Sequence, residues 1–139
     1  MDIKEGKKKR IIKEISIDED KIKSLLKTSA NKLQSQELMP LNEITTNSKV
    51  SLAYNSLREL LEALSIKNGL KIYNHEGYTA FIKEIIKKSS LGEDFDAVRK
   101  IRNSINYYGK TLTIEECQQT LPKIKELITK IKEIIKNEN

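Results

Sequence analysis

The sequence has few of the residues that cross-link small secreted domains or interrupt helices. It contains one cysteine, two prolines, five glycines and no tryptophan among 139 residues. The single cysteine, Cys117, excludes an intrachain disulfide and a zinc site made of several cysteines. Because the glycines are scattered along the chain, they do not form a glycine-rich phosphate-binding loop.

Long apolar segments are also missing. No apolar run approaches the ~20 residues that cross a bilayer. No apolar region follows the basic N-terminus, as it would in a secretory signal. We therefore expect a cytoplasmic protein without a membrane segment, and no residue pattern indicates a metal or a cofactor.

The residues that are present favour helices. Leucine, isoleucine, lysine and glutamate dominate, which leaves little material for strands. A chain of this length is sufficient for one domain. Apolar residues recur at helical spacing in five segments with short connections. The sequence therefore predicts an all-α fold, an up-and-down antiparallel bundle of four to five helices.

Capping signals set the expected boundaries of these helices. Ser16 and Glu19 have capping-box spacing, and so do Thr113 and Glu116. Gly109 is a natural helix stop, and Pro122 should kink the last helix or mark its true start. The predicted helices cover roughly residues 18–37, 48–67 (the strongest pattern), 74–86, 94–108 and 113–136, with Asn74 as the N-cap of the third.

The first ten residues hold half of the positive charge, +3 of the total +6. Residues 1–15 are predicted to be a basic, flexible N-terminal segment, and residues 16–139 the helical domain. The cations at 7–10 could contact nucleic acid or an acidic partner. The simpler interpretation, which we favour from sequence, is a solvated and frayed terminus.

The end of the fourth predicted helix, residues 98–109, is the most informative segment. Arginine is a permanent cation with a planar donor fork that suits phosphate. Asparagine is a poor residue for a helix interior, so two of them one turn apart require a reason. At 100° per residue, one face carries Val98, Ile101, Ile105 and Tyr108, and the other carries Arg99, Arg102, Asn103 and Asn106.

Two interpretations of this polar stripe are equally consistent with the spacing. In the first, which is purely structural, the arginines pair with carboxylates of neighbouring helices. In the second, the stripe holds phosphate or ribose oxygens, and Tyr107 and Tyr108 add a phenolic donor or a stacking surface. His75, the only histidine, is a candidate general base, although a structural role is the simpler interpretation; Cys117 is expected to be a small buried residue.

Residues 99–109 resemble the fourth-helix signature of the HEPN domains (higher eukaryotes and prokaryotes nucleotide-binding). The segment 54–64 is similar to the second helix of that family. Residues 69–76, Gly-Leu-Lys-Ile-Tyr-Asn-His-Glu, are similar to the turn before its third helix. The resemblance covers roughly residues 18–136.

The resemblance implies a small helical bundle, commonly a homodimer. Many HEPN proteins are metal-independent ribonucleases, often toxins whose antitoxin partner is a minimal nucleotidyltransferase. The active motif of these proteins is an arginine followed by a polar residue and, four to six positions later, a histidine. The active site forms where two copies of the helix that carries this motif meet across the dimer. Arg102 and Asn103 match the motif, but Tyr107, Tyr108 or Gly109 occupies the histidine position.

From this departure we expect binding rather than cleavage. The predicted function is binding of RNA or nucleotide phosphate in a toxin–antitoxin or nucleotidyltransferase-associated system. The predicted binding residues are Arg99, Arg102, Asn103, Asn106 and Tyr108. Two alternatives stay open: a ribonuclease toxin in which Arg102 acts with Tyr107 or His75 in place of the missing histidine, and a non-catalytic interaction module for a nucleotidyltransferase.

Overall fold

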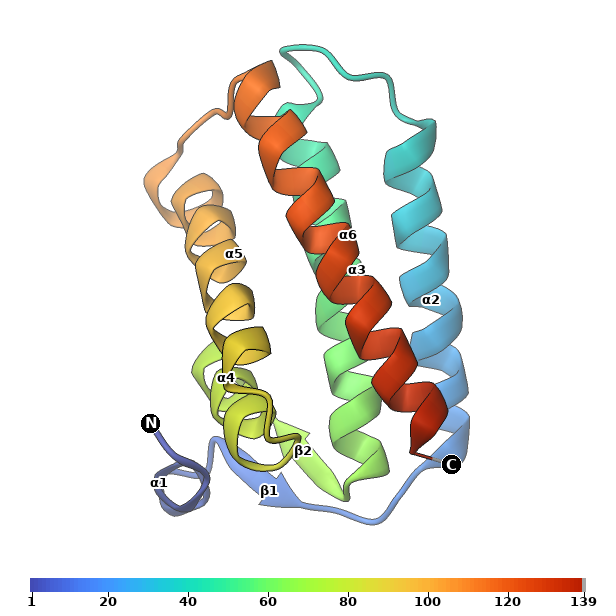
Figure 1. Ribbon diagram of the computed structural model, residues 1–139, viewed down its shortest axis with the longest axis vertical. Helices are drawn as coiled ribbons and strands as arrows, with labels where there is room; N and C mark the ends of the chain where they lie inside the picture. The colour runs from blue at the N-terminus through green and yellow to red at the C-terminus, as the bar shows by residue number, and fades with distance from the viewer. Residues whose placement is uncertain (139) are drawn as a thin grey trace.

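The computed structural model describes residues 1–138, and it confirms an all-helical, up-and-down antiparallel bundle (Figure 1). The four long helices alternate in direction, and α4 is a short helix between α3 and α5. The elements are α1 (Ile3–Lys8), β1 (Ile12–Glu14), α2 (Glu19–Leu38), α3 (Thr46–Lys67), β2 (Leu70–Ile72), α4 (His75–Glu84), α5 (Ser89–Tyr108) and α6 (Ile114–Asn137).

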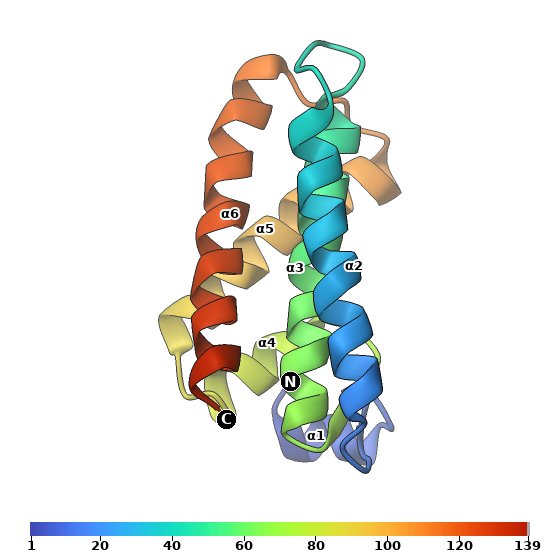
Figure 2. The same cartoon turned by 90° about the vertical axis from the view of Figure 1, so that its right-hand side faces the viewer.

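Helix α3 is the centre of the bundle. It packs against α2, α5, α6 and β2, and Figure 2 shows α5 crossing obliquely behind the other long helices. The predicted apolar stripe of α3 is confirmed as core, because residues at this spacing lie on one face of a helix. Its members are Ala53, Leu57, Leu60, Leu61 and Leu64.

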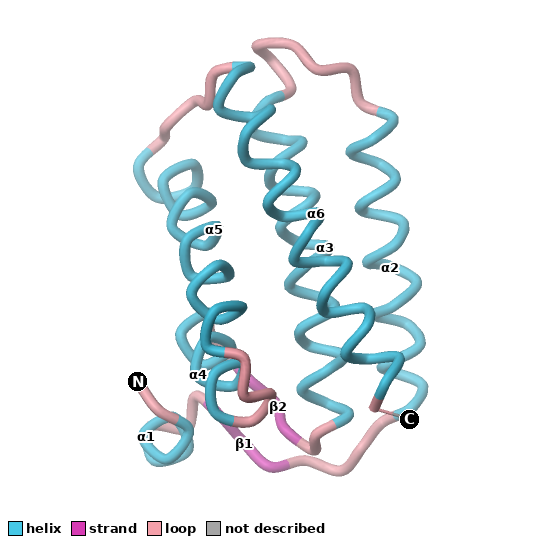
Figure 3. Tube along the Cα trace, in the orientation of Figure 1, coloured by secondary structure: helices cyan, strands magenta, loops and turns pink. Residues whose placement is uncertain are grey.

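The N-terminal segment is folded, in contrast to the flexible segment expected from its charge. Strand β1 pairs antiparallel with β2 in the register Ile12–Ile72, Lys13–Lys71 and Glu14–Leu70. Ile3 and Ile12 are buried, so apolar burial holds this segment against the bundle. The two-stranded ribbon lies at the same end as both termini, and the α2–α3 and α5–α6 connections lie at the opposite end (Figure 3).

Several helix boundaries agree with the capping signals. Asn74 caps α4, accepting from the Gly77 N–H at 2.8 Å. Thr113 and Glu116 form the predicted capping box of α6, and Gly109 ends α5 in the left-handed conformation.

Three boundaries differ from the prediction. Asp18, rather than Ser16, caps α2, accepting from the Lys21 N–H. Helix α6 begins at Ile114 and continues through Pro122, so this proline does not mark its start. Helix α5 begins at Ser89 instead of 93–94. Gly92 was expected in the break between two helices, but it lies inside α5. A Cβ atom at this position would be 2.7 Å from Cγ of Lys83, so glycine here permits close packing of α5 on α4.

Candidate functional site: an arginine–histidine cluster

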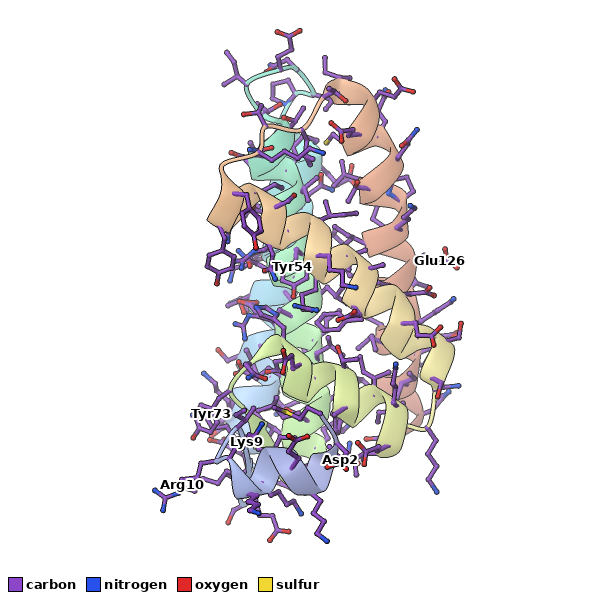
Figure 4. All side chains as sticks on the ribbon, turned by 90° about the vertical axis from the view of Figure 1, so that its left-hand side faces the viewer. Asp2, Lys9, Arg10, Tyr54, Tyr73 and Glu126 are labelled. Carbon is purple, nitrogen blue, oxygen red and sulfur yellow. The ribbon has the colours of Figure 1, made fainter. Side chains whose placement is uncertain are left out.

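A tyrosine–histidine pair lies where α3, α4 and α5 meet. Tyr54 projects from the middle of α3 and is fully buried, and His75 is the half-buried first residue of α4. The Tyr54 hydroxyl lies 2.5 Å from Nδ1 of His75. Figure 4 shows Tyr54 beneath the ribbon of α5, above α4. The Asn74 cap therefore places the only histidine against the central helix.

Arg102 of α5 covers this pair. Its guanidinium carbon lies 5.4 Å from the centre of the Tyr54 ring, a cation–π contact. The Tyr54 ring also stacks on Phe95, with centroids 6.0 Å apart. Asn106, one turn beyond Arg102, accepts from Nη1 at 2.9 Å in the carboxamide orientation that satisfies its hydrogen bonds. Within residues 1–138, Arg102 has only these neutral partners and forms no ion pair with a carboxylate.

Two further arginines flank the pair, and each has a carboxylate partner. Arg99 donates from Nε and Nη2 to Oδ1 of Asp96, at 2.9 and 2.7 Å. Arg58 of α3 forms an i,i+4 ion pair with Glu62 at 3.2 Å. The structural interpretation of the polar stripe expected carboxylates on neighbouring helices, whereas Arg99 pairs with Asp96 of its own helix and Arg102 pairs with no carboxylate within residues 1–138.

We call Tyr54, Arg58, His75, Arg99 and Arg102 the arginine–histidine cluster. Burial lowers the pKa of His75, and the charges of Arg102, Arg58 and Arg99 lower it further. Burial also raises the pKa of the Tyr54 hydroxyl, and this effect exceeds the opposing influence of the three arginines. At neutral pH the site therefore holds a neutral imidazole and a neutral phenol beside three guanidinium groups.

The hydrogen-bond pattern assigns the tautomer of His75. The buried Tyr54 hydroxyl has no other acceptor within the described chain, so it donates to Nδ1. The ring proton then lies on Nε2. His75 consequently offers an N–H donor, which is suited to an anionic oxygen, rather than the free nitrogen that a general base needs.

Two buried polar atoms near the cluster have no hydrogen-bond partner. They are the hydroxyl of Tyr78 and Oδ1 of Asn103; the other unpartnered atoms in the described chain belong to Gln36. Burial raises the pKa of Tyr78 and the nearby Arg58 guanidinium lowers it, so the Tyr78 hydroxyl lies beside a member of the cluster although it forms no well-aligned hydrogen bond. Buried polar atoms normally have partners, so these two are candidates for contact with a ligand.

The structure brings some predicted site residues together and separates others. Arg99, Arg102 and Asn106 lie on the face of α5 that carries the cluster, and Asn103 is half-buried beside them. Tyr107 and Tyr108 are 71% and 83% exposed and make no hydrogen bond or ring contact within residues 1–138. The expectation that Tyr108 joins the apolar face of this helix is therefore wrong, because Tyr108 is the last residue of α5 and the residues of this helix that pack against the core end at Ile105.

Tyr54, Arg58 and Tyr78 were not predicted as site residues. A signal was present in the spacing of Tyr54, Arg58 and Glu62, which recur every four residues along the helix whose apolar stripe forms the core. Such a polar line within a core helix requires polar partners on its neighbours.

Other candidate sites carry no comparable chemistry. Cys117 is buried as expected, and burial raises the pKa of its thiol. Residues 1–138 contain no group of three or more His, Cys, Asp or Glu side chains that could hold a metal. In the same residues, no helix is both long and apolar enough to cross a membrane. A surface depression lies between the α4–α5 connection and the end of α6, and none of the cluster residues lines it.

Comparison with known proteins identifies no relative: no protein-family model matches the chain, and no curated protein matches it.

Proposed function

We propose that this chain is a HEPN-like protein that binds the phosphate of RNA or of a nucleotide in the arginine–histidine cluster. The observation that carries the proposal is the environment of Arg102. Its guanidinium lies on Tyr54 beside His75 and has no carboxylate partner within residues 1–138. A half-buried cation without a counter-ion is a favourable place for an anion, because the anion supplies the missing charge.

The surrounding donors fit a phosphate group. Arg102 can offer two parallel N–H donors to a phosphate oxygen pair, and His75 offers Nε2–H. The hydroxyl of Tyr78, which lies near Arg58 and has no acceptor, adds a further donor. The helical bundle is also the fold that the resemblance to HEPN domains implies.

Replacement of Arg102 tests the proposal. We expect Arg102→Ala to weaken binding of a single-stranded oligonucleotide by about 10- to 100-fold, because it removes a pair of charge-assisted hydrogen bonds to phosphate. The magnitude of the slope of log K against log salt concentration should fall by about 0.7, the value for one phosphate of a single strand. Lys100→Ala is the matched control, since Lys100 is exposed on the same helix. An unchanged affinity and salt slope in Arg102→Ala would refute the proposal.

The second candidate is a metal-independent ribonuclease that uses His75. The Tyr54–His75 hydrogen bond within the arginine cluster favours it, because this bond keeps Nε2–H as a hydrogen-bond donor to the negative charge that develops on a phosphate oxygen in the transition state, while Arg102 holds the phosphate. Incubation of the protein with RNA in the presence of EDTA tests this candidate. Cleavage that His75→Gln abolishes would support it, and intact RNA at high protein concentration would exclude it.

The resemblance also predicts a homodimer and a nucleotidyltransferase partner in a toxin–antitoxin system. Light scattering of the purified protein tests the first. Co-purification with the product of a neighbouring nucleotidyltransferase gene tests the second and the interaction-module alternative.

A further inference from the structure

A second group of exposed cations lies on the two-stranded ribbon. Lys13 and Lys71 are direct cross-strand partners, and both are exposed, whereas the adjacent pair Ile12–Ile72 is buried. Like charges placed directly opposite each other destabilise a strand pair. Neither lysine forms an ion pair within residues 1–138. The ribbon therefore holds uncompensated positive charge on its solvent face.

Arg10 and Tyr73 extend this charged face. Arg10 adopts a left-handed backbone conformation, with φ of 60°, which is unusual for a residue with a side chain. Tyr73 is 56% exposed, and Nζ of Lys71 lies 5.3 Å from its ring centre. A shallow depression lined by Lys7, Arg10, Ile12, Lys13 and Tyr73 lies at this place. Figure 4 shows Arg10 and Tyr73 at the lower left of the molecule, below Tyr54.

Two of the three carboxylates in residues 1–15 are paired with lysines, and the third, Asp2, caps α1. Glu14 binds Lys7 at 3.0 Å, and Glu5 binds Lys9 at 2.9 Å. These carboxylates therefore do not neutralise Arg10, Lys13 or Lys71. We call these three cations and Tyr73 the basic ribbon.

The basic ribbon leads directly into the arginine–histidine cluster. Tyr73 precedes His75 by two residues, so their Cα atoms are at most about 7 Å apart. The chain leaves β2 at Ile72 and enters α4 at His75. One extended strand of nucleic acid could therefore contact both places.

We propose that the basic ribbon is a second binding site for single-stranded RNA, occupied by nucleotides next to the phosphate in the arginine–histidine cluster. The cations would contact backbone phosphates, and the Tyr73 ring would stack on one base. The exposed ring favours RNA over a lipid surface or an acidic protein, because the unstacked bases of a single strand stack on aromatic side chains. This inference rests on the proposed function, since the same RNA strand would occupy both sites.

The test compares two ligands by fluorescence anisotropy or calorimetry: a ten-nucleotide oligouridine and uridine monophosphate. The variant Arg10→Gly, Lys13→Gln, Lys71→Gln removes the three cations; glycine suits the left-handed position, and glutamine removes the like-charge pair. We expect the oligouridine affinity to fall at least tenfold. The salt slope should fall by about 0.7 for each phosphate that the variant no longer neutralises. Binding of uridine monophosphate should be unchanged, because the cluster is intact.

A matched control removes three exposed lysines elsewhere, on α2 and α6: Lys27→Gln, Lys123→Gln, Lys132→Gln. It has the same net charge as the ribbon variant, so we expect near wild-type binding. An equal reduction of affinity in both variants would overturn the proposal, because it would indicate non-specific attraction. If the triple ribbon variant does not fold, Lys71→Gln alone is measured, and the same comparison is made with Lys123→Gln.

Tyr73 separates RNA from other polyanions. We expect Tyr73→Ala to weaken oligouridine binding about tenfold and Tyr73→Phe to preserve it, because phenylalanine still stacks. Neither change should affect binding of inorganic polyphosphate. Equal binding of oligouridine, polyphosphate and phosphatidylserine vesicles, with no effect of Tyr73→Ala, would overturn the assignment to RNA.

The two proposals fail differently. If Arg102→Ala abolishes uridine monophosphate binding while the ribbon variant binds oligouridine normally, the cluster is supported and the ribbon is refuted. If only the ribbon variant weakens oligouridine binding, the cluster is refuted. Absence of oligouridine binding by the wild-type protein refutes both.

Discussion

The environment of His75 differs from what its local sequence indicates. Its neighbours Asn74 and Glu76 are ordinary residues of a helix start. The charges that lower its pKa come from Arg58, Arg99 and Arg102, on two other helices. The protonation state of the site is therefore a property of the packed bundle.

This environment predicts a pH dependence of binding. The lowered pKa keeps His75 neutral in the free protein. A bound phosphodiester offsets the arginine charges and raises that pKa, so binding takes up a proton. The affinity for RNA should therefore increase as the pH falls towards and below about 6.5, the ordinary pKa of histidine. Titration calorimetry of the wild type and His75→Gln checks this, since the glutamine variant should show a flat profile; an equal slope in both would assign the effect to another group.

The two buried tyrosines predict different effects of removing a hydroxyl. Tyr54→Phe removes the hydrogen bond to Nδ1 of His75 and should lower the free energy of unfolding by about 1 kcal/mol. Tyr78→Phe removes a hydroxyl that lies near Arg58 but forms no well-aligned hydrogen bond, so it should change stability less than Tyr54→Phe does. Urea unfolding measures both changes. If the Tyr78 hydroxyl contacts the ligand, Tyr78→Phe also weakens RNA binding, and comparable destabilisation by both variants would contradict the assigned hydrogen bonds.

At the scale of the element, the turn from β2 into α4 positions the site. Asn74 caps the helix by accepting from Gly77 N–H, and a Cβ on Gly77 would lie 2.6 Å from Cγ2 of Ile72. The absence of a side chain at 77 thus lets the first turn of α4 pack on β2. His75 lies within this turn, so its position depends on that close approach.

Gly77→Ala should therefore destabilise the protein by about 1–3 kcal/mol through overpacking. Gly109→Ala is a useful contrast, because position 109 has a φ of 65° but open space around it. Only backbone strain is expected there, about 1 kcal/mol. Thermal unfolding compares the stabilities of the two variants. Gly77→Ala should also weaken RNA binding, whereas Gly109→Ala should not. Equal effects of the two variants on RNA binding would show that the turn from β2 into α4 does not position the site.

Local signals predicted helix boundaries well where a cap was unambiguous. Asn74, Gly109 and Thr113 were all identified correctly. The start of α5 was predicted four to five residues too late, because Ser89 and Gly92 indicate a helix break when considered alone. Gly92 instead lies inside the helix, where Lys83 of α4 approaches it; that approach is a tertiary contact with no local signature.

At the scale of the whole molecule, the N-terminal segment is part of the folded structure. Ile12 of β1 is 2% exposed and pairs with Ile72 of β2. The Ile3 N–H also donates to Glu84, at the end of α4, at 2.9 Å. These contacts attach residues 1–15 to the elements that carry His75.

Deletion of residues 1–15 should lower the free energy of unfolding by about 3–5 kcal/mol, because the burial of Ile3 and Ile12 and the strand partner of β2 would be removed. Substitution of the exposed Lys4 and Lys8 by Gln is the control, since it changes the charge of this segment without exposing apolar surface. Urea or thermal unfolding measures the effect. An unchanged stability after deletion would restore the interpretation of a frayed terminus.

The sequence by itself determined the helical class, the order of the long helices and the core stripe of α3. These follow from caps and from i,i+3 and i,i+4 spacing, which act within a few residues of the chain. Only the tertiary structure decided that Arg102 lies on Tyr54 beside His75, that Arg99 is tied to Asp96, and that the N-terminal segment forms a ribbon with β2. Each of these outcomes except the Arg99 pair joins residues far apart in sequence. The Arg99–Asp96 pair is local. Lys100 also forms an ion pair with Asp96, and the packing of α5 decides that the Arg99 side chain is less exposed than the Lys100 side chain.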